Sequence, residues 1–138
     1  MKKIEYIGIF FEADKFYEIE NVKCYERLFR TIDFPHVTVK YKPDEIPLEL
    51  FGQKVVIRCV GYGKDEENEA FFVEFVEYPD GMEDLIKEIQ VPHITLSVSE
   101  KGKAVNSGSL EFSDIAEPFC VEGVFGGMDY ERNLITSK

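Results

Sequence analysis

The sequence of 138 residues has no tryptophan, only three cysteines and only two histidines. The cysteines (Cys24, Cys59 and Cys120) lie far apart and form no CxxC pair. An odd number of scattered cysteines argues against a disulfide framework and against a thiolate zinc site. Two histidines are too few for a histidine-rich metal cluster. We therefore expect ordinary reduced thiols, no metal and no cofactor.

Long apolar segments are also absent. No stretch approaches the run of roughly 18 apolar residues that a membrane-spanning helix needs. The N-terminus starts with Met and two lysines before Ile4, as a signal peptide does, but Glu5 and Glu12 interrupt the apolar region and no small-residue cleavage site follows. These features predict a cytoplasmic protein with no membrane partner.

Positive charge is scarce as well. The chain has 16 Lys and Arg against 27 Asp and Glu, which gives a formal net charge of −11. Such a field repels an extended nucleic acid unless a local basic patch overrides it. We therefore expect a small nucleotide or the end of an RNA as the partner, and no long duplex. The oligomeric state stays open.

Apolar and aromatic residues, in contrast, are plentiful. They make up 44% of the chain and include 12 Phe and 7 Tyr, enough for one hydrophobic core without covalent staples. Because no repeat, low-complexity tract or linker interrupts the sequence, we predict a single domain over residues 1–138.

Strand patterns dominate along the chain. The hydrophobic alternation and the turn residues predict strands at 4–11, 36–42, 54–62, 70–78, 93–99 and 119–125, with Gly126 and Gly127 ending the last one. Helical spacing predicts short helices at 21–31 and 82–90. The acidic run 64–69 is interpreted as a solvated hairpin connection. The pattern is α+β, rich in strands and mostly antiparallel.

Both histidines lie in the same short pattern, Pro-His-apolar-Thr-apolar, which occurs at residues 35–39 and again at residues 92–96. Side chains two positions apart in a strand share a face. Each histidine would therefore lie beside its threonine on a polar face, while the aliphatic residues anchor the strand in the core. The two polar sets are His36, Thr38 and Lys40, and His93, Thr95 and Ser97.

Two imidazoles fit the chemistry of phosphodiester cleavage by in-line displacement. One group takes a proton from the attacking oxygen, and the other gives a proton to the departing oxygen. The reference pKa of histidine, about 6.5, makes both protonation states available near neutral pH. Each threonine hydroxyl can donate a hydrogen bond to a non-bridging phosphate oxygen. The pattern therefore predicts a metal-free phosphate site.

A single His-x-Thr pattern on a strand is usually structural, because the imidazole can satisfy a nearby carbonyl and threonine favours β structure. Taken alone, each segment favours that interpretation. The chain, however, has no histidine outside these two segments. We therefore interpret the duplication as functional.

The paired motifs at 36–39 and 93–96 resemble those of the two-histidine (2H) phosphoesterase superfamily. Its members include RNA 2′,3′-cyclic phosphodiesterases, the cyclic phosphodiesterase module of tRNA ligases, 2′,5′-phosphodiesterases and phage enzymes that destroy cyclic-nucleotide signals. The resemblance covers roughly the whole chain. It implies a bilobal α+β fold of two mostly antiparallel sheets, related by a pseudo-two-fold axis, with few short helices and the strand 4–11 in a central position. Each lobe would contribute one motif to a central cleft.

The resemblance also implies the roles of the motif residues. His36 and His93 become the acid–base pair, and Thr38 and Thr95 bind the phosphate; which histidine is the base stays open. The chain departs from the family in being short, with only 57 positions between the two histidines. Because the long helices that shape RNA binding in some relatives do not fit, a large RNA substrate is in doubt.

Three further residues near the motifs are weaker candidates for substrate binding. Lys40 and Ser97 follow the threonines on the same faces and could contact phosphate or ribose, although a lysine at a strand end is more often solvated. Tyr41, like Tyr6, could stack on a base, although packing on the sheet is the commoner role. Positive charge from Lys54 and Arg58, which share a strand face, is a further but weak possibility.

The leading functional hypothesis is metal-independent hydrolysis of a 2′,3′-cyclic phosphate or of a 2′-linked phosphodiester, on a nucleotide or an RNA end. A second hypothesis is an enzyme that degrades cyclic nucleotides or oligonucleotides used as signals, of the phage counter-defence type. A third, from another class, is a nucleotide- or RNA-binding module without turnover. Base preference and product regiochemistry depend on loops that the sequence does not position.

Overall fold

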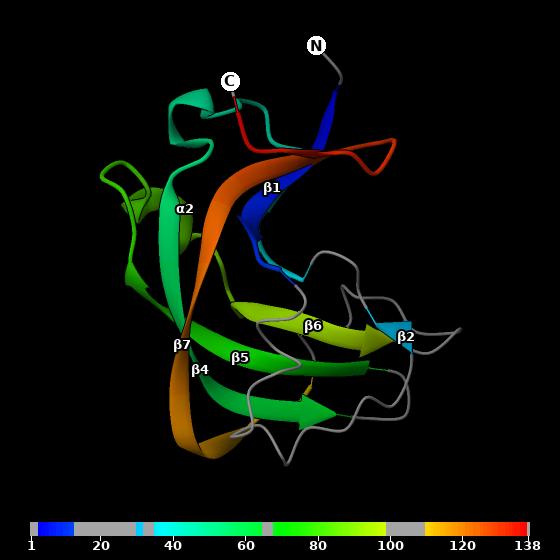
Figure 1. Ribbon diagram of the computed structural model, residues 1–138, viewed down its shortest axis with the longest axis vertical. Helices are drawn as coiled ribbons and strands as arrows, with labels where there is room; N and C mark the ends of the chain where they lie inside the picture. The colour runs from blue at the N-terminus through cyan, green and yellow to red at the C-terminus, as the bar shows by residue number, and fades with distance from the viewer. Residues whose placement is uncertain (1–2, 13–29, 32–34, 65–67, 99–109, 138) are drawn as a thin grey trace.

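The computed structural model describes residues 3–12, 30–31, 35–64, 68–98 and 110–137 (Figure 1). These residues are mostly in strands, with one short helix. The strands are β1 (Ile4–Phe10), β2 (Arg30–Thr31), β3 (His36–Tyr41), β4 (Lys54–Lys64), β5 (Asn68–Glu77), β6 (His93–Val98), β7 (Ser113–Asp129) and β8 (Leu134–Ile135). A 3₁₀ turn, η2 (Leu48–Leu50), precedes β4, and helix α2 (Glu83–Lys87) follows β5.

The strands pair into one antiparallel sheet in the order β2-β6-β5-β4-β7-β1-β3, with β8 beside β7. Six of them (β1, β3, β4, β5, β6 and β7) curl into a nearly closed barrel, in which the terminal strands β3 and β6 come into contact. The prediction of an α+β, bilobal fold with two sheets is therefore wrong, because the described residues form a mostly-β structure with a single barrel and one short helix. The reason lies in β7, whose 17 residues pair first with β4 and then with β1, so that what would be two sheets are joined into one.

Most predicted strands are confirmed to within a few residues, because alternation and the prolines before β3 and β6 define them locally. Three expectations are corrected. The first strand, β1, lies between β7 and β3, next to an end of the sheet, whereas β4 and β7 are central. The last strand, expected at 119–125, runs from Ser113 to Asp129, so Gly126 and Gly127 lie inside β7 and do not end it. Helix α2 is shorter than 82–90.

The N-terminal helix expected at 21–31 lies almost wholly outside the described residues. Its last two residues, Arg30 and Thr31, are described, and they form β2 against β6. The strand β8 was not predicted. It follows a tight turn in which the buried carboxylate of Asp129 accepts hydrogen bonds from the backbone N–H groups of Glu131 (2.9 Å) and Asn133 (2.8 Å).

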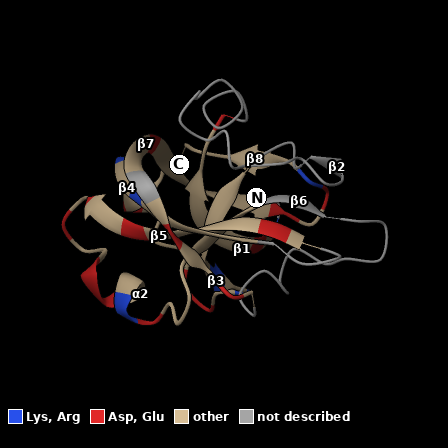
Figure 2. Cartoon of the chain, turned by 90° about the horizontal axis from the view of Figure 1, so that it is seen from below, with Lys and Arg blue, Asp and Glu red and all other residues tan. Residues whose placement is uncertain are grey.

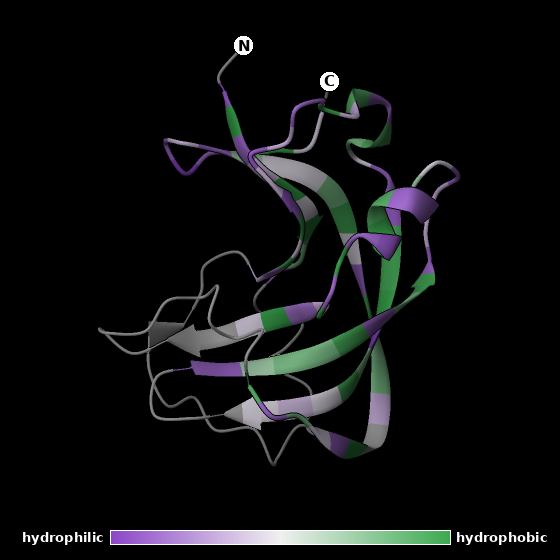
Figure 3. Cartoon of the chain, turned by 180° about the vertical axis from the view of Figure 1, so that it is seen from behind, coloured by the Kyte–Doolittle hydropathy of each residue, from purple (hydrophilic) through white to green (hydrophobic). Residues whose placement is uncertain are grey.

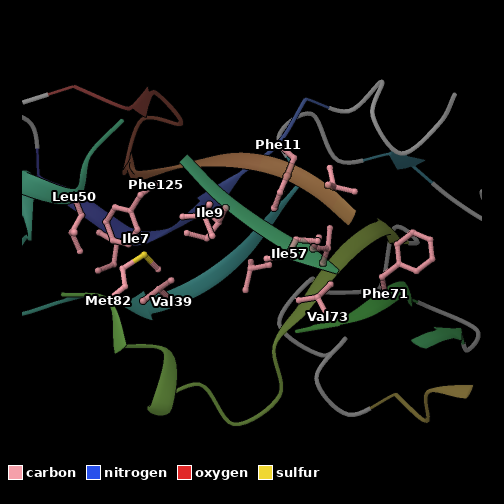
Figure 4. Close-up of a cluster of buried hydrophobic side chains, with 14 of the residues drawn as sticks. Ile7, Ile9, Phe11, Val39, Leu50, Ile57, Phe71, Val73, Met82 and Phe125 are labelled. Carbon is pink, nitrogen blue, oxygen red and sulfur yellow. The ribbon is translucent and has the colours of Figure 1, made fainter. Parts of the chain in front are cut away.

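The hydrophobic core takes side chains from one face of all six barrel strands, which we call the core face (Figure 4). Met82, at the start of α2, and Leu50 of η2 also belong to it. Figure 3 shows hydrophobic residues along the long strands and hydrophilic residues around α2. The fully buried members include Ile7, Ile9, Val37, Val55, Ile57, Cys59, Phe71, Val73, Met82, Ile94 and Phe125.

No helix in the described part of the chain is long and apolar enough to span a membrane.

Candidate functional site

The two motif strands, β3 and β6, are neighbours across the gap of the barrel. Each pairs with an inner strand, β3 with β1 and β6 with β5, and the two strands also come into contact with each other. Val37 of β3 and Ile94 of β6 are fully buried on the core face. His36 and Thr38, and likewise His93 and Thr95, therefore lie on the opposite face of the sheet, as the alternation predicted.

The two motifs make the same pairing with their neighbouring strands. His36 lies opposite Phe10 and Thr38 opposite Gly8 in the β1–β3 pair. In the β5–β6 pair, Phe72 takes the place of Phe10, Ala70 takes the place of Gly8, and they face His93 and Thr95. Each motif histidine thus faces a phenylalanine, and each threonine faces a residue with a minimal side chain. We call each such set of four residues a pairing unit.

Backbone hydrogen bonds extend the correspondence. The N–H of Phe11 donates to the carbonyl of Pro35 (2.9 Å), and the N–H of Val73 donates to the carbonyl of Pro92 (3.1 Å). In both pairs the register shifts at the residue after the threonine, so that Ile7 faces Lys40 and Glu69 faces Ser97. The correspondence is one of local pairing within a single sheet. Residues 8–10 and 70–72 share a small-apolar-Phe pattern, which is the sequence signal from which this correspondence could have been predicted.

His36 is half-buried in a cluster of aromatic rings on the face opposite the core. Its ring lies 4.9 Å from that of Tyr6, with 26° between the planes, and 5.3 Å from that of Phe10. Gly8 lies between these two residues, and a Cβ atom there would come within 2.3 Å of the carbonyl oxygen of Val37. Tyr6 is buried with its ring stacked on that of His36, so it packs within the protein and does not present its ring to a base. Burial raises the pKa of its hydroxyl.

His93 is held by a hydrogen bond. Its Nδ1 lies 2.8 Å from the backbone carbonyl oxygen of Val91. Because a carbonyl only accepts, Nδ1 carries a proton in both charge states of the ring. Nε2 is therefore the nitrogen that can exchange a proton, as in histidines that a carbonyl orients for catalysis.

The two threonines differ in exposure. Thr38 is exposed, whereas Thr95 is only 6% exposed. The Thr38 hydroxyl can therefore contact a ligand in solvent, whereas the Thr95 hydroxyl is largely shielded from solvent by the protein. This difference could not be inferred from two motifs of the same pattern.

The weaker candidates are not gathered at the histidines. Lys40 forms an ion pair with Glu88 beyond α2 (3.7 Å), and both side chains are largely exposed. The Tyr41 side chain is 58% exposed, and its hydroxyl donates a long hydrogen bond to Glu5 (3.4 Å). Ser97 is positioned by its backbone, which pairs with Thr31 on one side and with Glu69 on the other.

Lys54 and Arg58 do not add free charge to the motifs, because each is paired on the sheet surface. Lys54 lies 3.7 Å from Glu122, and Arg58 forms an ion pair with Glu74. Such exposed pairs contribute little stability.

Glu69 departs most from the sequence-based expectation. We expected a solvated residue in the acidic run, but its side chain is fully buried. Its carboxylate accepts a hydrogen bond from the Tyr62 hydroxyl (2.5 Å). Lys64 belongs to β4, and Asn68 and Glu69 belong to β5, so the expected connection over 64–69 is too long. Residues 65–67 lie outside the described residues.

Cys59 is buried in the core and Cys120 is exposed, and both are free thiols. Burial raises the pKa of the Cys59 thiol, so this side chain stays protonated in the folded protein. Among the residues that the structure describes, no three His, Cys, Asp or Glu side chains are grouped so as to hold a metal ion.

Comparison of the sequence with protein-family models and with curated proteins finds no match.

Proposed function

We propose that this chain is a metal-independent phosphodiesterase that hydrolyses a 2′,3′-cyclic phosphate, or a 2′-linked phosphodiester, of a nucleotide or an RNA end. The observation that carries the proposal is the repeated pairing unit. Strands β3 and β6 each carry a His-x-Thr segment whose histidine faces a phenylalanine and whose threonine faces a glycine or an alanine. These two strands are in contact where the barrel nearly closes. Such a repeat is expected if both histidines act on one phosphate.

In the proposed reaction, a water oxygen attacks phosphorus and the bond from phosphorus to the leaving ribose oxygen breaks. One imidazole accepts the proton of the water, and the other, as imidazolium, donates a proton to the leaving oxygen. The threonine hydroxyls donate hydrogen bonds to the non-bridging oxygens as their charge increases. The anchored Nδ1 of His93 supports a role for its Nε2 as the proton-exchanging atom.

The first experiment is a turnover screen in the presence of EDTA. It uses 2′,3′-cyclic mononucleotides, a 2′,5′-linked dinucleotide and several cyclic di- and trinucleotides as substrates. Wild type is compared with a His36→Ala/His93→Ala double variant and with a Cys120→Ala control on the exposed surface. Hydrolysis by wild type and control but not by the double variant is expected. Equal hydrolysis by all three proteins would show that other groups do the chemistry, and hydrolysis that EDTA abolishes would refute the metal-free reaction.

Two observations favour a second candidate, a nucleotide- or RNA-binding module without turnover. Thr95 is nearly inaccessible, and the His36 ring packs against those of Tyr6 and Phe10. Both features restrict contact with a substrate. This candidate predicts that the wild type binds a nucleotide but hydrolyses none of the panel, and that histidine substitutions change affinity alone.

A further inference from the structure

Lysine and arginine side chains gather around exposed tyrosines at one end of the sheet. There β1 begins, β3 ends and the β7–β8 turn follows. The Lys3 ammonium lies 5.9 Å from the centre of the Tyr130 ring, and the Lys42 ammonium lies 5.6 Å from that of Tyr41. We call this surface the tyrosine–cation patch: Lys3, Tyr41, Lys42, Tyr130 and Arg132.

The backbone of the patch is unusual. Lys42 (φ 48°) and Arg132 (φ 68°) are the only two non-glycine residues with positive φ in the described part of the chain. A side chain in this conformation costs about 1–3 kcal/mol, and such residues concentrate at ligand sites. Backbone hydrogen bonds stabilise both conformations. The Lys42 N–H donates to the Glu5 carbonyl (2.7 Å), and the Arg132 N–H donates to the Asp129 carbonyl (3.2 Å).

The patch is continuous with the histidine site. Tyr6, whose ring stacks on that of His36, pairs across the strands with Tyr41. Arg132 lies close enough to the Tyr6 hydroxyl to lower its pKa, against the larger effect of burial. The buried Tyr6 therefore lies between His36, which its ring contacts, and Tyr41 of the patch, which it faces across the strands.

The chemistry of the patch fits single-stranded nucleic acid. Tyr41 and Tyr130 are 58% and 45% exposed, and their rings can stack on unpaired bases. Ammonium and guanidinium groups bind phosphates. The chain as a whole carries a net charge of −11, and Figure 2 shows acidic segments around α2 and β5. Lys3, Lys42 and Arg132 bring three positive charges to this end of the sheet, beside the carboxylates of Glu5 and Glu131.

We propose that the tyrosine–cation patch binds the single-stranded nucleotides that flank the phosphodiester held at His36. The inference rests on the proposed function, because it assumes that the phosphodiester lies at His36. It predicts that the end of an oligonucleotide binds more tightly than a free mononucleotide.

The test is fluorescence anisotropy with a labelled single-stranded RNA of about ten nucleotides ending in a 3′-phosphate, and with the same sequence as a duplex. One variant is Lys3→Gln/Lys42→Asn/Arg132→Asn, in which asparagine tolerates the positive φ. A second is Tyr41→Ala/Tyr130→Ala. The matched control, Lys54→Gln/Arg58→Gln/Lys87→Gln, removes the same number of positive charges from other exposed sites.

We expect wild type and control to bind the single strand alike and more tightly than the duplex. The tyrosine variant should lose about tenfold in affinity per ring. In the cation variant, the slope of log affinity against log salt should fall by about 2, because each single-strand phosphate contact contributes about 0.7. Affinity equal to wild type in both patch variants overturns the inference, as does a wild type that does not bind.

The outcome is distinguishable from failure of the proposed function. That failure appears as a wild type without turnover in the EDTA screen, whether or not the single strand binds. Failure of the patch appears in anisotropy alone, with hydrolysis of cyclic mononucleotides intact in the wild type.

Discussion

Glu69 holds the place in the β5–β6 pairing that Ile7 holds in the β1–β3 pairing. Each lies opposite the second residue after a motif threonine, and each is fully buried. One pairing unit therefore continues into an aliphatic core residue, and the other into a carboxylate that accepts a hydrogen bond from Tyr62. The two pairing units thus share their strand pairing but differ in the chemistry of the buried residue next to them.

Replacing Tyr62 by phenylalanine should destabilise the protein. The change keeps the contact between the rings of residues 62 and 71 but removes the hydroxyl that donates to the buried Glu69 carboxylate. The free energy of unfolding should fall by about 1–3 kcal/mol. Urea unfolding measures the difference. Tyr130→Phe on the exposed surface is the matched control and should stay within about 0.5 kcal/mol. Equal stability of both variants would mean that the hydrogen bond contributes nothing.

The stability of the protein should fall at alkaline pH because of Cys59. Burial raises the pKa of this thiol above its usual value of 9.0, so the folded state keeps a proton that the unfolded state releases above about pH 9. The free energy of unfolding then decreases by up to about 1.4 kcal/mol per pH unit above that point. Below pH 9 this group has no effect.

Urea unfolding at pH 8 and pH 10 tests this dependence. Cys59→Ala should show a smaller decrease than wild type, by about 1.4 kcal/mol. Cys120→Ala removes only the smaller contribution of the exposed Cys120 thiol to the raised Cys59 pKa and should keep most of the wild-type decrease. A Cys59→Ala variant with the full wild-type decrease would assign the effect to other groups, among them Tyr6, whose pKa is also raised by burial.

The two threonines should separate activity from stability. Thr38→Ala removes an exposed hydroxyl, so turnover should fall about 100-fold while stability changes by less than about 0.5 kcal/mol. Thr95→Ala should lower turnover and also cost about 1 kcal/mol, because this hydroxyl is buried. The measurements are initial rates on the best substrate and urea unfolding. Full turnover in Thr38→Ala would remove this residue from the site.

Local pattern was enough to predict most of the strands. Alternation identified β3 and β6, and Pro35 and Pro92 marked where they begin. The single sheet could not be predicted in the same way, because it depends on β7 pairing with both β4 and β1. Gly126 and Gly127 suggested a strand end, yet they lie where Ile135 and Ile4 come so close that a Cβ atom would clash or crowd them.

For the site, the sequence predicted which side chains share a face, since that follows from strand periodicity. It did not predict their surroundings. The packing of Tyr6 and Phe10 around His36, the burial of Thr95 and the burial of Glu69 all depend on chain segments distant in sequence. The Tyr62 partner of Glu69 is near in sequence, but only the β4–β5 hairpin register brings the two side chains together.

The measurement that tests the central claim most directly is NMR of the histidine rings. Because the chain has only two histidines, ring labelling gives two sets of signals, which His36→Ala and His93→Ala assign. A nucleoside 2′-phosphate is titrated at constant pH with EDTA present. We predict that the signals of both rings shift with one common dissociation constant, because one phosphate lies between them. A shift in the signals of only one ring, or of neither ring, would contradict the proposed site.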